Sequence, residues 1–155
     1  MIRLTFYFTL TAAALSLLFM AYKSVIAQSK NTARGLTSDG MPITCGSKPN
    51  CVSTSEQRDA YKMQPFEVME GITIADISNI LKEKPSPEVS KIEENYLHLT
   101  YRTPIFKFPD DVEFTIQDGK LLFRSQSREG HSDLGKNRSR LNEISTHLRG
   151  AGVIK

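Results

Sequence analysis

The most informative stretch of this 155-residue sequence is Asp111-Val-Glu-Phe-Thr-Ile-Gln-Asp-Gly-Lys-Leu-Leu-Phe-Arg-Ser-Gln126. At its centre lies Asp118-Gly119, a pair that favours a two-residue turn between antiparallel strands. On both sides of this turn apolar and polar side chains alternate, which is typical of strands with one buried face. The stretch therefore predicts a β-hairpin.

The turn also predicts which residues of the hairpin face each other. A shift of one residue would point Glu113 and Arg124 into the core, so the pattern opposes any other register. Because one face of an antiparallel sheet is commonly solvated, we expect Glu113 and Arg124 to form an ion pair on a solvent-exposed face. The expected pairs are Phe114 with Phe123, Ile116 with Leu121, Glu113 with Arg124, and Asp111 with Gln126.

Three further segments have a clear periodicity. Residues 96–102 alternate and predict another strand. Apolar residues at helical spacing predict a helix over residues 74–81, which Pro85 and Pro87 would end. A second helix is predicted by Leu134, Leu141, Ile144 and Leu148, with Ser132 or Asp133 as N-cap and an end near Gly150. We expect an α+β fold, an antiparallel sheet of at least three strands with two helices packed on one face.

The N-terminal segment, residues 1–27, differs in kind from the rest. The uncharged stretch LTFYFTLTAAALSLLFMA, from Leu4 to Ala21, would form a helix about 27 Å long, close to the thickness of a bilayer core. Two interpretations stay open. Ala27 suits cleavage of a signal peptide before Gln28, whereas the length of the apolar run suits an uncleaved membrane anchor. Both predict export to the periplasm or to the extracytoplasmic face of a bacterial inner membrane.

The two cysteines are consistent with export. Cys45 and Cys51 enclose a turn-forming sequence and predict a structural disulfide in an oxidising compartment. A zinc site would need two further ligands, and no Cys or His pair is spaced to supply them, so we expect no metal. We also expect no cofactor. Residues 28–44 are rich in small polar residues and predict a flexible tether before a single domain over residues 45–150.

Two groups of polar residues are candidates for a site. The first group would serve a hydrolase-like enzyme, with Asp110, Asp111 and Glu113 as general acid or base together with His98 or His131. The second lies where a strand ends in a loop that leads to a helix, where backbone amides and arginines suit an anion. Its members are Arg124, Arg128, His131, Ser132, Lys136 and Arg138. An equally open alternative is a polar network of Arg128, Asp133, Asn137 and Arg138 that holds the loop between sheet and helix.

Several short stretches resemble the domain of unknown function 1499 family. They are Cys45-Gly-Ser-Lys-Pro-Asn-Cys-Val-Ser53, Tyr96-Leu-His98, Phe106-x-Phe108, Asp110-Asp-Val-Glu-Phe114 and Arg124-Ser-Gln-Ser-Arg-Glu-Gly-His-Ser-Asp-Leu-Gly-Lys-Asn-Arg138. Gln126 and Lys136 depart mildly from the family pattern. The resemblance implies a small exported or membrane-associated protein of a bacterial type, with relatives in plant plastids, and it implies no particular activity.

Charge excludes one class of function. The chain has 20 Lys and Arg against 17 Asp and Glu, a surplus too small for a nucleic-acid binder. We therefore expect an envelope domain without catalytic activity that binds a protein partner or an anionic ligand through residues 124–138, with the hydrolase as the alternative. Residues 4–21 would contact the membrane if they are retained.

Overall fold

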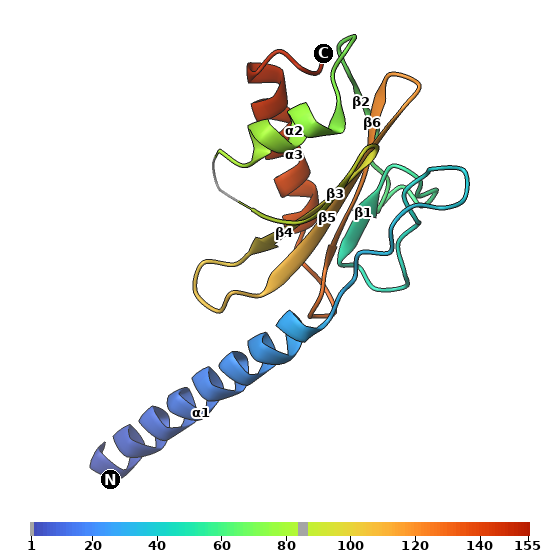
Figure 1. Ribbon diagram of the computed structural model, residues 1–155. Coiled ribbons are helices and arrows are strands. Elements are labelled where there is room, and N and C mark those ends of the chain that lie inside the picture. Colours follow the sequence, from blue (N-terminus) through green and yellow to red (C-terminus); the bar gives the residue numbers. More distant parts are fainter. Residues whose placement is uncertain (1, 84–86) are drawn as a thin grey trace.

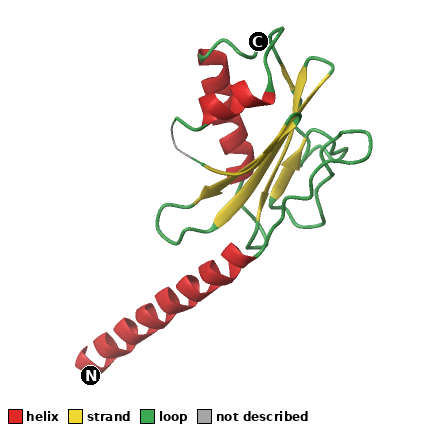
Figure 2. Ribbon diagram, viewed as in Figure 1, coloured by secondary structure: helices red, strands yellow, loops and turns green. Residues whose placement is uncertain are grey.

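The computed structural model describes residues 2–83 and 87–155, with the backbone alone for residues 2–6. Its sheet contains six antiparallel strands in the order β1-β6-β5-β4-β3, and β2 pairs with β6 beside β1. Their bounds are Cys51–Ser53 (β1), Phe66–Glu67 (β2), Glu88–Glu93 (β3), Tyr96–Arg102 (β4), Pro109–Gln117 (β5) and Lys120–Ser127 (β6). Helices α2 (Ile74–Leu81) and α3 (Lys136–Gly150) pack on one face of the sheet, which confirms the predicted α+β fold (Figures 1 and 2).

The predicted hairpin is the centre of the sheet. Strands β5 and β6 pair Phe114 with Phe123 and Glu113 with Arg124, which confirms the expected register. Strands β1, β2 and β3 were not predicted from the sequence. The first two contain three and two residues, too few to show a period, and β3 is a largely exposed edge strand without a buried apolar face.

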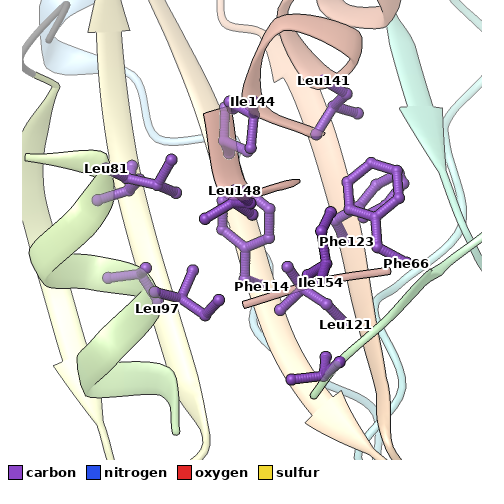
Figure 3. Packing of buried hydrophobic residues seen from close by; sticks show 14 of the residues in the cluster. Phe66, Leu81, Leu97, Phe114, Leu121, Phe123, Leu141, Ile144, Leu148 and Ile154 are labelled. Carbon is purple, nitrogen blue, oxygen red and sulfur yellow. The ribbon is translucent and has the colours of Figure 1, made fainter. Parts of the chain in front are cut away.

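The core lies between the sheet and the two helices. Phe114, Phe123 and Leu148 are fully buried there (Figure 3). Phe66 of β2 packs on Phe123 with ring centroids 4.7 Å apart. The last residues of the chain also belong to the domain, because Ile154 is buried in the same cluster and its backbone pairs with Val68. The folded unit therefore continues past the predicted end at residue 150.

Helix α2 begins at Ile74 and its N-cap is a reciprocal capping box. Thr73 Oγ1 accepts the Asp76 amide at 3.3 Å, and Asp76 Oδ2 accepts the Thr73 amide at 2.9 Å. The helix ends at Leu81, as predicted. Pro85, one of the two prolines expected to end it, lies outside the described residues.

Helix α3 begins later than predicted. Its N-cap is Gly135, and Leu134, which the sequence places on the buried face of the helix, lies outside it and is 91% exposed. The Asp133 carboxylate accepts the backbone amides of Gly135 at 3.1 Å and Asn137 at 2.8 Å. Asp133, two residues before the N-cap, therefore supplies hydrogen-bond acceptors for free backbone amides at the start of α3. The helix begins without Leu134 as a buried residue.

Helix α1 (Ile2–Ser29) projects from one end of the domain and is long and apolar enough to cross a membrane (Figure 1). Its last turns are in contact with the domain. Ser24 Oγ donates a hydrogen bond to the Phe106 carbonyl, and Ser24 and Ala27 are buried. Lys23 and Lys30 both form ion pairs with Glu129, the Lys23 Nζ–Glu129 Oε1 distance being 2.5 Å.

Candidate functional site

The face of the sheet opposite the helices contains most of the predicted site residues. Asp111 and Glu113 on β5, His98 on β4 and Arg124 on β6 all point to this polar face, and each is at most 6% exposed. The prediction of a solvent-exposed face is therefore wrong. Burial arises because residues 30–36, here called the strap, cross the polar face and hydrogen-bond to it.

The strap lies against the sheet instead of extending freely as the predicted tether would. Thr32 donates its amide, at 2.9 Å, and its hydroxyl, at 2.6 Å, to Asp111 Oδ2. The amides of Arg34 and Gly35 donate to Glu113 Oε1 at 3.0 and 2.7 Å. Small and polar residues, which predicted flexibility, here allow backbone amides to approach the two carboxylates closely.

The Asp111 carboxylate is saturated with donors. Arg128 forms a two-pronged ion pair with it, from Nε to Oδ2 at 2.9 Å and from Nη2 to Oδ1 at 2.7 Å. His98 Nε2 lies 2.7 Å from Oδ1, and Thr32 supplies the two bonds described above. Burial alone would raise the pKa of Asp111, but the hydrogen bonds from His98, Arg128 and Thr32 together hold that pKa well below its usual range. Asp111 is thus a fixed negative charge.

Glu113 is held in the same way. Tyr96 donates its hydroxyl to Oε1 at 2.7 Å, and Arg124 Nη1 donates to Oε2 at 2.9 Å. Burial, the hydrogen bond to Glu113 and the nearby negative charges raise the pKa of Tyr96 strongly, so this phenol stays a donor. Arg124 also donates to the Thr32 carbonyl at 2.9 Å and to Gln126. Burial lowers the pKa of Arg124, an effect that the charge of Glu113 opposes.

These contacts do not assemble the predicted hydrolase site. A general base needs a free lone pair that faces a substrate, and the oxygens of Asp111 and Glu113 are covered by donors of the chain itself. Asp110 projects from the opposite face of β5, where it pairs with Arg140 of α3. In the described part of the chain no hydrogen bond connects His131 to any of these carboxylates, and the His131 side chain is exposed.

A metal centre is likewise not assembled on either face. Over residues 2–83 and 87–155, no three His, Cys, Asp or Glu side chains are grouped closely enough to hold an ion. The two cysteines instead form the predicted Cys45–Cys51 disulfide, which brackets the turn before β1.

The predicted anion-binding group is divided by the fold. Arg124 and Arg128 are used on the polar face, and Arg138 donates to the backbone carbonyls of Ala60 and Lys62 at 3.0 and 2.9 Å. The amides at the start of α3 are already occupied by Asp133. His131, Ser132 and Lys136 remain exposed. Three of the six predicted residues are therefore structural, and the arginines cannot meet at one ligand.

A buried polar network connects the loop before α3 to the sheet. Asn137 accepts a hydrogen bond from Ser125 at 2.6 Å and donates to Ser127 Oγ at 3.1 Å and to the Asn50 carbonyl at 2.9 Å. Arg140 donates to Asn137 Oδ1 at 2.8 Å. This network resembles the predicted alternative but differs in its members. Asn50 and Arg140 belong to it, and nothing in their sequence spacing indicated that they would.

A cleft of about 320 Å³ lies at the junction of α1 with the domain. One wall is formed by α1, through Phe19, Met20 and Lys23, and another by Thr103 and Phe108 of the β4–β5 connection. The remaining wall comes from the end of β6, the loop before α3 and the first residue of α3. Its residues include Ser127, Glu129, Gly130, Ser132, Asp133 and Lys136. This junction cleft brings two exposed members of the predicted anion-binding group, Ser132 and Lys136, together with the apolar helix.

The carboxylates of the junction cleft are bound by donors of the chain itself. Asp110 pairs with Arg140, and Asp133 accepts amides at the start of α3. Glu129 is bound by Lys23 and Lys30, whose hydrogen bonds lower its pKa to about 2. Among the described residues no carboxylate lies within ion-pair distance of Lys136. Lys136 is therefore the charged side chain of the cleft lining for which the described residues provide no hydrogen-bond or ion-pair partner.

Most of the chain matches a known protein family. The family described as Protein of unknown function (DUF1499) matches residues 43–148. This chain belongs to that family. The match confirms the predicted resemblance and covers the whole sheet and nearly all of α3, but leaves out α1 and the strap. No curated protein and no solved structure matches the chain.

Proposed function

We propose that this DUF1499 protein is a membrane-anchored, extracytoplasmic domain without catalytic activity, which binds an anionic amphiphile in the junction cleft. The observation that carries the proposal is the composition of that cleft. Apolar side chains of Phe19, Met20 and Phe108 line it together with the ammonium group of Lys136, which has no ion-pair partner among the described residues. Such a site suits a ligand with an acyl chain and a phosphate or carboxylate head.

Retention of α1 as an anchor is supported by its junction with the domain. The helix runs without interruption through Ala27 and Gln28, the predicted cleavage site, and Ala27 is fully buried. A peptidase would need this segment exposed and extended. The disulfide supports an oxidising compartment for the domain.

We expect the mature protein, purified from membranes, to retain residues 1–27. Intact-mass spectrometry measures this directly. A chain that begins at Gln28 would remove Phe19, Met20 and Lys23 from the cleft and would contradict both the anchor and the binding site.

For ligand binding, we expect Lys136→Gln to weaken binding of a short-chain phosphatidylglycerol about tenfold, because one charge-assisted contact is lost. Calorimetric titration of the full chain in a neutral detergent measures the affinity. Lys91→Gln is the matched control, since Lys91 is an exposed lysine on the edge strand β3 whose partner is Glu93. This control should bind as the unaltered protein does.

Two further ligands separate the possible sources of the anion. Glycerol phosphate carries the head group alone, and short-chain phosphatidylcholine has the same chains with a neutral head. We expect both to bind more weakly than phosphatidylglycerol. Equal affinity for glycerol phosphate and phosphatidylglycerol would show that the apolar wall contributes nothing to binding. Absence of phosphatidylglycerol binding would contradict the proposed function.

A further inference from the structure

Two connections at the base of the domain display large apolar side chains to solvent. Among the described residues outside α1, the exposed large apolar side chains are those of Met69 at 45%, Ile92 at 46%, Ile105 at 82% and Leu134 at 91%. Ile105 lies in the β4–β5 connection and Leu134 in the loop before α3. The two most exposed of these side chains therefore lie on segments that line the same cleft, residues 103–108 and residues 130–136 (the loop before α3 with the first residue of α3), here called the basal loops.

The basal loops lie at the end of the domain from which α1 departs (Figure 1). Both contribute to the junction cleft, where Thr103, Phe108 and Lys136 lie around the same space as Phe19 and Met20. The hydrogen bond from Ser24 to the Phe106 carbonyl holds one of these loops directly against α1. The position of α1 in a bilayer therefore determines where the basal loops lie.

The charge pattern along α1 places the membrane boundary beside these loops. The uncharged run ends at Tyr22, and Lys23 is the first charged residue after it. Phe19 and Met20 are thus within about one helical turn of the boundary, given a rise of about 1.5 Å per residue. Residues that share a cleft with them lie at the depth of the lipid head groups.

Each basal loop contains one residue other than glycine in the left-handed region. Lys107 and Leu134 adopt positive φ values of 55° and 52°, a conformation that is uncommon for residues other than glycine. In water the Leu134 side chain, 91% exposed, buries little apolar area, whereas in a lipid interface it gains apolar contacts. Lys107 and Lys136 beside these apolar residues suit anionic head groups.

We propose that the basal loops rest in the interfacial layer of an anionic bilayer, with Ile105 and Leu134 inserted among the lipids. This inference rests on the proposed anchoring by α1 and goes beyond it, because the domain itself becomes a membrane-binding surface. Held in this way, the junction cleft opens directly to the lipid layer that would supply its ligand.

The absence of tryptophan from the chain allows a direct test. Ile105→Trp, Leu134→Trp and the control Met69→Trp each introduce a single fluorophore at an exposed site, so the fold should tolerate them. Met69 lies beside Val153, far from α1, and its amide donates to the Val153 carbonyl. The full-length variants are reconstituted in phosphatidylglycerol-containing vesicles, and emission is compared with ordinary and with brominated lipids.

We expect brominated lipids to remove most of the emission of Ile105→Trp and Leu134→Trp and to leave Met69→Trp unchanged. Emission from the two basal sites that is as insensitive as that of Met69→Trp would overturn the inference. Phe19→Trp tests the premise separately. If this variant is not quenched, the anchor is wrong and the basal surface is rejected with it. Quenching of Phe19→Trp alone rejects the surface and leaves the anchor.

Discussion

Replacing Arg124 with methionine is expected to lower the free energy of unfolding by about 3–5 kcal/mol, because the substitution strands a buried charge. Glu113, 1% exposed, would keep its negative charge and lose the guanidinium 2.9 Å away. The strap would also be weakened, because the hydrogen bond that Arg124 donates to the Thr32 carbonyl would be lost. Urea unfolding of the full chain in mild detergent, followed by tyrosine circular dichroism, measures the change.

Arg102→Met is the matched control for this experiment. Arg102 pairs with Glu88 at 2.6 Å on the exposed edge of the sheet, where an ion pair contributes about 0–1 kcal/mol. The double variant Glu113→Gln with Arg124→Met should recover part of the loss, since no buried charge remains. Equal costs for Arg124→Met and Arg102→Met would show that the polar face is not buried in solution.

Asp111→Asn is expected to be the second large effect, about 3–5 kcal/mol at neutral pH. The amide would place an NH₂ group among donors from Arg128, His98 and Thr32, and the positive charge of Arg128 would lose its partner. Asp118→Asn makes the same chemical change in the exposed hairpin turn and should alter stability by no more than about 0.5 kcal/mol.

The pH dependence of stability gives Asp111→Asn a distinct signature. The pKa of Asp111 is lowered in the folded protein, whereas an Asp side chain in the unfolded chain has a pKa of about 3.9. The stabilisation is therefore complete above about pH 5, where both states are ionised, and is lost as the pH falls below the unfolded-state pKa and through the folded-state pKa. Between neutral and acid pH, the free energy of unfolding should fall less steeply for Asp111→Asn than for the unaltered protein. The same pH dependence in both proteins would contradict the role assigned to the Asp111 carboxylate.

The hairpin shows how far local sequence can predict this fold. Alternation along β5 and β6, together with the Asp118-Gly119 turn, predicted the register that the structure confirms. Both signals act between residues close in the chain, so they are visible without tertiary contacts. The start of α3 was mistaken for the opposite reason. Leu134 fitted the apolar spacing, but the Asp133 carboxylate and the left-handed Gly135 begin the helix later.

The candidate site depended on contacts that no local pattern contains. Alternation correctly separated the polar face from the core, but no local pattern indicated which segment would cover the polar face. Its cover comes from amides 78 and 79 residues away in the chain, at Thr32, Arg34 and Gly35. Backbone donors are the same in every residue, so composition cannot indicate which carboxylate they will bind.

From the sequence alone follow the apolar N-terminal helix, the disulfide, the α+β class and the hairpin register, because each depends on side-chain periodicity or on residues close along the chain. The tertiary structure alone decided that Asp111, Glu113 and Arg124 are buried structural charges, and that Lys136 meets Phe19 in a cleft. The reason is physical. Whether a charge binds a ligand or stabilises the fold depends on which donors surround it, and here those donors arrive from distant parts of the chain.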